Sequence, residues 1–162
     1  MKIVSDASPL IFLSKIGRLQ LLESHTLLIP TQVAEEILQG KAAEKPDCLA
    51  IAERLTAGQI TVKPIALLQN VPFTIGAGEN AAVALALREH ADILLIDDKK
   101  GRKLAQLLHC QARGTLAVLI DAYREKRMTL MELKGDLQRL MAIGFRIPED
   151  KLLSILNEVE RT

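Results

Sequence analysis

Short apolar segments alternate with helical segments along this chain, and this alternation limits its fold more than any other feature. Ile3-Val4 and residues 93–96 are apolar runs of strand length. Residues 60–65 form a third run, which Pro64 places at a sheet edge. Strands that alternate with helices are typical of a parallel sheet covered on both faces. The sequence therefore predicts the α/β class, as a three-layer α/β/α fold around a central parallel sheet.

The C-terminal third of the chain is expected to be helical. Thr129 and Glu132 have the spacing of a capping box, and Pro148 is expected to begin the last helix. A chain of 162 residues is long enough to bury one core, and no long linker divides it. We therefore expect a single domain, residues 1–162, with a core at 1–125 and a helical extension at 126–162.

Charge and aromatic content exclude several classes of function. The net charge is +1, so a nucleic acid has to be held by a local patch or through metal ions. Aromatic residues make up 2% of the chain, too few for a base-stacking platform. No apolar run reaches the roughly 18 residues that would span a membrane, and Asp6 comes too early for a signal peptide. Because Cys48 and Cys110 are isolated and expected to be reduced, we predict a cytoplasmic protein.

Three acidic residues are expected to meet at one edge of the sheet. Asp6 directly follows the first strand, Asp97 ends the strand 93–96, and Glu79 lies in the first turn of the helix that Gly76 opens. Strand ends and the helix starts that follow them share one edge of a parallel sheet, where open α/β folds bind ligands. Taken alone, Asp6 is equally explained as a turn cap, and Glu79 as a charge that offsets the helix dipole.

A fourth acid comes from the pair Glu35-Glu36. Both glutamates flank the apolar face of the helix that follows Pro30 to a similar extent. The helical period therefore leaves open which of the two reaches the shared edge.

Acidic side chains that converge in this way imply a cation. Two like charges 5 Å apart repel by roughly 3 kcal/mol at an effective dielectric of 20. Several such pairs would exceed what a marginally stable domain tolerates. An all-oxygen site suits Mg²⁺ or Mn²⁺. The three histidines are interpreted as surface or helix-end residues, so a zinc site is not expected.

A basic run, Lys99-Lys100-Gly101-Arg102-Lys103, begins the helix after Asp98. Positive charge is unfavourable at a helix start. One interpretation is a solvated surface, and the other is that some of these cations face the acids and hold phosphates. Arg102 is the best candidate for the second role, because a planar guanidinium matches a phosphate.

These residues resemble the PIN-domain family. The resemblance covers about residues 3–125 and rests on motifs that occur in order: Ser5-Asp6-Ala7-Ser8-Pro9-Leu10, Pro30-x-x-Val33-x-x-Glu36-Ile37, Gly78-Glu79-x-Ala81-Ala82-x-Ala84-Leu85-Ala86, Leu95-Ile96-Asp97-Asp98-x-x-Gly101-Arg102 and Gly114-Thr115. The tail, Gly144-Phe145-Arg146-Ile147-Pro148 before Leu152-Leu153, resembles a prokaryotic subgroup found in toxin–antitoxin gene pairs. The resemblance implies helices around a parallel sheet and a metal-dependent ribonuclease site.

Carried over by position, the resemblance implies Asp6, Glu36, Glu79 and Asp97 as the catalytic and metal-binding acids. It selects Glu36 from the pair that periodicity left open, with binding either direct or through water. Many PIN domains have Thr-x-Asp at the fourth acid, and Leu95-Ile96 offer no hydroxyl here, so Asp98 is the second choice for this position.

The leading hypothesis is a toxin-like endoribonuclease that hydrolyses RNA with Mg²⁺ or Mn²⁺, and with Ser8 and Arg102 orienting the substrate. An antitoxin protein is a candidate partner, and the apolar C-terminal helices make a homodimer another. Two alternatives come from other classes. One is a catalytically idle interaction protein that keeps the fold. The other is a Mg²⁺-binding phosphoacceptor module similar to a receiver domain.

Overall fold

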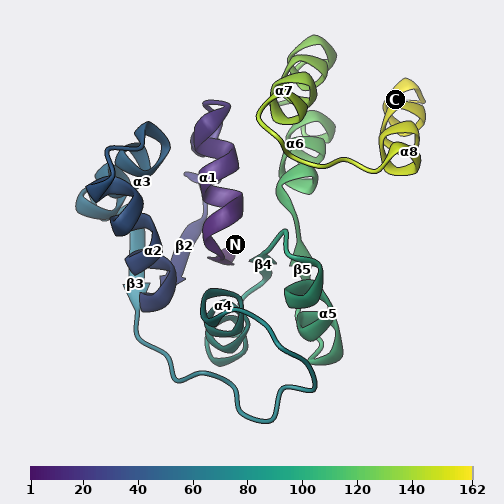
Figure 1. Ribbon diagram of the computed structural model, residues 1–162. Helices are drawn as coiled ribbons and strands as arrows, with labels where there is room; N and C mark the ends of the chain where they lie inside the picture. The colour runs from purple at the N-terminus through teal and green to yellow at the C-terminus, as the bar shows by residue number, and fades with distance from the viewer. Residues whose placement is uncertain (162) are drawn as a thin grey trace. The chain divides into compact units, whose positions relative to one another are not determined.

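The computed structural model describes residues 1–161, which form five strands, eight α-helices and one 3-10 helix (Figure 1). The strands are β1 (Lys2–Ser5), β2 (Thr26–Pro30), β3 (Ile60–Lys63), β4 (Ile93–Leu95) and β5 (Ala112–Arg113). The helices are α1 (Ala7–Lys15), η1 (Leu19–Leu22), α2 (Thr31–Ala42), α3 (Pro46–Thr56), α4 (Ala77–Arg88), α5 (Lys99–Leu107), α6 (Thr115–Arg124), α7 (Leu130–Ala142) and α8 (Glu149–Glu160). Strands and helices alternate as predicted, and the fold is three-layer α/β/α.

The strands form one parallel sheet in the order β3-β2-β1-β4-β5. β1 lies in the middle, and β3 is an edge strand that ends before Pro64, as the sequence predicted. Pro64 lacks an N–H, so it cannot extend a ladder of hydrogen bonds. Ser5 of β1 pairs in register with Leu95 of β4, so these two strands end at the same level.

The strand order creates a switch point beside β1. The chain passes from β1 to β2 and β3 on one side of the sheet, and then crosses over to β4 and β5 on the other. In open α/β sheets, ligands bind outside the carboxyl ends of the strands where the order reverses. Asp6 follows β1 and Asp97 follows β4, so both lie at the place where this rule puts a site.

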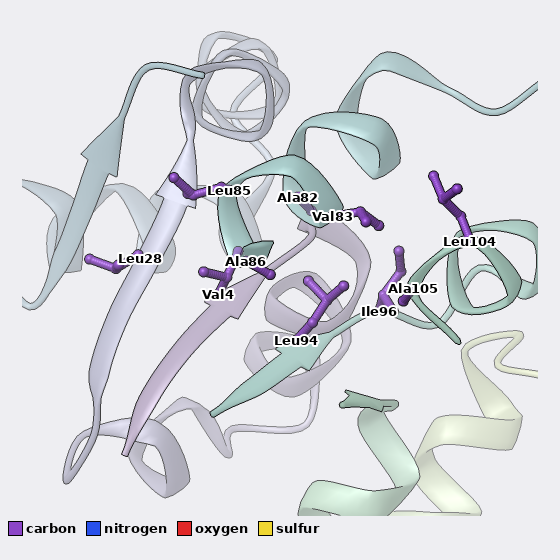
Figure 2. Close-up of a cluster of buried hydrophobic side chains, with 10 residues drawn as sticks. All are labelled: Val4, Leu28, Ala82, Val83, Leu85, Ala86, Leu94, Ile96, Leu104 and Ala105. Atoms are coloured by element: carbon purple, nitrogen blue, oxygen red, sulfur yellow. The ribbon is translucent and has the colours of Figure 1, made fainter. Parts of the chain in front are cut away.

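One hydrophobic core lies between the sheet and the helices α4 and α5 (Figure 2). Val4, Leu28 and Leu94 come from three neighbouring strands, and the Ala- and Leu-rich face of α4 covers them. Because successive strand residues point to opposite faces, Ile3 and Ile29 belong to the other face, where they are also buried. Two buried faces explain why these strands are continuous apolar runs.

A long connection without helix or strand, residues 64–76, joins β3 to α4 and runs past α4 (Figure 1). Five half-buried side chains attach it to the core of Figure 2: Ile65, Leu68, Val71, Phe73 and Ile75. The buried side chain of Asn80 holds this connection through both its amide oxygen and its amide nitrogen. Asn80 Oδ1 accepts from Leu68 N at 2.7 Å, and Asn80 Nδ2 donates to Leu68 O at 3.1 Å. This connection is therefore fixed to the first turn of α4.

Two helix boundaries differ from those that residue type alone favours. Serine favours the N-cap and proline the first helical position, which would begin the helix at Pro9, but α1 begins at Ala7 with Asp6 at the N-cap. Proline fits anywhere in the first turn, because the N–H groups there have no partner within the helix. Gly40 is of the residue type that commonly ends a helix, yet α2 continues to Ala42, and Gly40 instead lets Cys48 of α3 pack closely.

The chain divides into two compact units, Met1–Thr115 and the remainder from Leu116. That division falls earlier than residue 125, and a single functional domain stays a prediction. In the second unit, Thr129 and Glu132 form the predicted capping box of α7, and Arg124 pairs with Glu158 of α8. None of the helices in residues 1–161 has the length and apolar character to cross a lipid bilayer.

Candidate functional site

Asp6 is the most buried acid of the candidate site, with 2% of its surface exposed. Its backbone N–H donates to Leu95 O at 2.9 Å. This bond continues the pairing of β1 with β4 by one residue and fixes the backbone from which the Asp6 side chain extends. Asp6 occupies the N-cap of α1, but its side chain makes no capping hydrogen bond there. The interpretation of Asp6 as a simple turn cap is therefore not supported.

The surroundings of Asp6 oppose its negative charge. Burial is the largest cause that raises the pKa of Asp6, to about 7, and the nearby charges of Glu79, Glu36 and Asp98 raise it further. The backbone N–H of Ala7 acts in the opposite direction and lowers it. A buried carboxylate surrounded by other carboxylates is unfavourable unless a cation or a proton accompanies it. Perturbed groups of this kind are typical of functional sites.

The structure places Glu36 beside Asp6. A Cβ atom built on Gly78 would lie 3.5 Å from Asp6 Oδ1 and 3.6 Å from Glu36 Oε2, so the two oxygens approach the same point. Burial and then the charge of Glu79 raise the pKa of Glu36. Glu35 and Glu36 are both solvent-exposed, and only Glu36 is among the charges that raise the pKa of Asp6.

Glu79 reaches this place from the first turn of α4, as predicted, and its side chain is half-buried. Its carboxylate folds back over Gly76, the N-cap residue, so that a Cβ on Gly76 would overlap Glu79 Oε2. The start of α4 therefore supplies Glu79. It also supplies Gly76 and Gly78, whose missing side chains leave room for Glu79, Asp6 and Glu36.

The two aspartates after β4 differ in what holds them. Asp97 Oδ1 accepts from Thr115 N at 2.8 Å, and Asp97 Oδ2 accepts from the Thr115 hydroxyl at 2.6 Å. Asp98 is exposed, caps α5 through Gly101 N at 2.7 Å, and is one of the charges that raise the pKa of Asp6. Of the two aspartates, Asp98, the second choice for the fourth acid, is the one whose charge raises the pKa of Asp6.

Basic side chains lie next to these acids. A Cβ on Gly114 would lie 2.8 Å from Asp97 Oδ1 and 3.2 Å from Arg102 Nη1, which shows that Arg102 extends to the end of β4. Lys99 and Lys100 are exposed in the first turn of α5. Ser8, the predicted hydroxyl contact, is half-buried in the first turn of α1, two residues after Asp6.

The donor set fits a hard divalent cation, because carboxylate oxygens are the ligands that Mg²⁺ and Mn²⁺ prefer. As placed, no three His, Cys, Asp or Glu side chains of residues 1–161 already form a group that could hold a metal ion. The exposed side chains of Glu36 and Asp98 are the ones that a change of rotamer can bring closer.

The chain matches the model of a known protein family. The family model DUF3368, described as a PIN domain, matches residues 2–161. The chain belongs to the PIN-domain family. PIN domains are typically nucleases and generally use divalent metal ions. The resemblance drawn from the motifs is confirmed, and the family match extends through the C-terminal helices of this PIN domain.

A solved structure supports the PIN-like fold. The chain is similar to a PilT N-terminus domain protein from the hyperthermophilic archaeon Sulfolobus solfataricus P2, with a TM-score of 0.52 and 19% sequence identity. The similarity covers 75% of this chain and 93% of that one. At this identity the likeness shows the fold alone. A comparison with the curated proteins found no match.

Three features of this PIN domain were not found from its sequence. Thr115 holds Asp97 from 18 residues further along the chain. Asn80 fixes the long connection before α4, and Gly78 lies between two carboxylates. Signals existed for two of them: Thr115 belongs to the Gly114-Thr115 motif, and two glycines so close to a helix start are unfavourable for the helix and call for another explanation.

Proposed function

We propose that this PIN domain is a metal-dependent endoribonuclease that hydrolyses phosphodiester bonds of RNA. The observation that carries the proposal is the setting of Asp6. This carboxyl group is buried at the switch point of the sheet, and Glu79, Glu36 and Asp98 all oppose its negative charge. A divalent cation removes that conflict, and the family typically has nuclease activity.

In this proposal Asp6, Glu36, Glu79 and Asp98 hold a Mg²⁺ or Mn²⁺ ion. Asp97 is assigned to the same edge as a positioning residue, because Thr115 engages both of its carboxylate oxygens. When bound, the ion lowers the pKa of a water molecule and neutralises charge that develops on the phosphate. Burial fixes the position of Asp6, while the exposed side chains of Glu36 and Asp98 can adjust to the substrate.

The substrate is expected to be held by its backbone. Arg102 lies beside the acids, and its planar guanidinium can donate two hydrogen bonds to one phosphate. Lys99 and Lys100 add positive charge in the same turn. The hydroxyl group of Ser8 can donate a hydrogen bond to the RNA backbone near Asp6. Few aromatic side chains are present, so we propose contacts with phosphates and sugars rather than stacking on bases.

The phosphoacceptor alternative is less well supported by this fold. Receiver domains have the strand order 2-1-3-4-5, whereas the sheet here has the order β3-β2-β1-β4-β5. An antitoxin partner and a homodimer stay predictions.

The proposal is tested by incubating a structured RNA with the purified protein and Mn²⁺, and comparing wild type with Asp6→Asn. Asp150→Asn, an exposed substitution on α8, serves as the matched control. We expect cleavage by wild type and Asp150→Asn, and a loss of about 100-fold or more in Asp6→Asn, since binding of the ion and its chemistry are both affected. Equal cleavage by all three proteins would identify a contaminant and reject the proposal.

Manganese titration by calorimetry separates the nuclease from a catalytically idle PIN domain. The proposed site predicts Mn²⁺ binding that Asp6→Asn abolishes. An idle domain would show no binding that depends on Asp6.

A further inference from the structure

Gly78 is the second residue of α4, and the helix itself does not need a glycine there. Its backbone is helical, so no left-handed conformation requires glycine. Alanine is a better helix former than glycine, because glycine loses more backbone freedom on folding. A methyl group at Gly78 would also fit, since each of its nearest neighbours would lie at ordinary van der Waals distance. Local structure and packing therefore both leave this glycine unexplained.

Two other helical glycines are explained by close packing. A Cβ on Gly40 would overlap Cys48 Sγ, and a Cβ on Gly101 would overlap Ile96 Cδ1. Each of these glycines lets a neighbouring element approach more closely than alanine would allow. Gly135 of α7 is the opposite case, because nothing lies within 4 Å of its Cβ position. Gly78 belongs to neither group.

The neighbours of Gly78 are the oxygens of two acids. The nearest atoms to its Cβ position are Asp6 Oδ1 at 3.5 Å and Glu36 Oε2 at 3.6 Å, followed by a Val33 methyl at 3.9 Å. A methyl group would therefore stand against both carboxylates at once. It would occupy space in front of these oxygens that a bound cation or its water molecules would need, and it offers the oxygens no hydrogen bond.

We propose that Gly78 is a positioning residue whose missing side chain keeps open the space that a divalent cation shares with Asp6 and Glu36. This inference rests on the proposed metal-dependent function. It adds a residue that shapes the metal site without supplying a ligand atom. It makes an unusual prediction: replacing Gly78 with alanine stabilises the fold and weakens cation binding in the same protein.

The experiment compares Gly78→Ala with wild type and with Gly135→Ala, by Mn²⁺ calorimetry and by thermal unfolding without metal. Both substitutions add a methyl group to a helical position, but only Gly78 faces the carboxylates. We expect the midpoint of metal-free unfolding to rise by up to about 3 °C in each variant. We expect Mn²⁺ to bind about 10–100-fold more weakly to Gly78→Ala and unchanged to Gly135→Ala, as when the surroundings of metal ligands are altered.

Asp6→Asn is measured alongside, so that the two proposals fail in different ways. If wild type binds Mn²⁺ through Asp6 and Gly78→Ala binds it equally well, the role of Gly78 is rejected and the proposed function stands. If Gly78→Ala weakens binding but also lowers the unfolding midpoint, the methyl group disturbs the fold and the role of Gly78 is again rejected. If wild type shows no binding that depends on Asp6, the proposed function is rejected, and the role of Gly78 with it.

Discussion

Thr115 donates hydrogen bonds to both carboxylate oxygens of Asp97, from its backbone N–H at 2.8 Å and from its hydroxyl at 2.6 Å. Thr115 is fully buried, and α6 begins at this residue. The pair joins the end of β4 to the start of that helix. Asp97 therefore holds the start of α6, next to Asp98, whose charge raises the pKa of Asp6.

Removing the Thr115 hydroxyl is expected to destabilise the protein. Thr115→Val keeps the shape of the side chain but leaves Asp97 Oδ2 without its donor. The loss is about 1–3 kcal/mol in the free energy of unfolding, measured by urea titration, because the bond involves a charged, half-buried group. Thr115→Ser retains the hydroxyl and should stay close to wild type. A Val variant as stable as the Ser variant would show that the bond contributes nothing.

Asn80 is expected to control the order of the connection over residues 64–76. Asn80→Ala removes both hydrogen bonds to the Leu68 backbone. We expect a loss of about 1–3 kcal/mol in stability and faster amide exchange within that connection, measured by hydrogen exchange. Asn80→Asp retains the acceptor for Leu68 N and should give an intermediate effect. If amide exchange became faster only outside residues 64–76, this role of Asn80 would be contradicted.

The metal-free protein is expected to lose stability as pH rises from about 4 to 7. The pKa of Asp6 is raised from 3.8 to about 7 on folding, so in this window the folded protein binds a proton that the unfolded chain releases. By linkage the free energy of unfolding falls with rising pH, by up to about 4 kcal/mol for this group. The raised pKa of Glu36 acts in the same direction.

Urea titrations of wild type and Asp6→Asn between pH 4.5 and 8 measure this contribution. The stability of Asp6→Asn relative to wild type should increase over this range, because the variant cannot ionise at residue 6. Mn²⁺ affinity of wild type should increase over the same range, since the ion displaces the proton. A difference between the two proteins that does not change with pH would contradict the raised pKa.

Lys99 and Lys100 are expected to contact RNA phosphates. Replacing either with alanine should weaken RNA binding to a similar degree for unrelated sequences. It should also reduce the slope of log affinity against log salt concentration by about 1. Lys41, near the end of α2 away from the acids, provides the control variant Lys41→Ala. Equal slopes for all three variants would show that α5 does not bind the RNA backbone.

Much of the fold could be predicted because local signals agreed with it. Pro64 marks the edge strand, the apolar run 93–96 marks an inner strand, and the Thr129–Glu132 spacing marks a capped helix. The ends of helices were less certain, because glycine at Gly40 serves packing against another helix rather than termination. Glycine can either end a helix or allow close packing, and the sequence does not show which applies unless the distant packing partner is known.

The positions of the candidate acids were predictable only where position along the chain determines position at the sheet edge. Asp6 and Glu79 follow from this rule, since one ends a strand and the other begins a helix. Glu35 and Glu36 do not, because both flank the same helical face. The roles of Asp97 and Asp98 depend on Thr115 and Asp6, which are distant in sequence. Contacts of this range have no periodic signal.

The proposed metal site at Asp6 can be located by the anomalous scattering of Mn²⁺ in a crystal of the wild-type protein. We expect a manganese peak within coordination distance of Asp6, about 2–2.5 Å from its carboxylate, with Glu36, Glu79 or Asp98 as further ligands directly or through water. A well-ordered crystal at saturating Mn²⁺ whose manganese peaks all lie elsewhere, with the four carboxylates still apart, would contradict it.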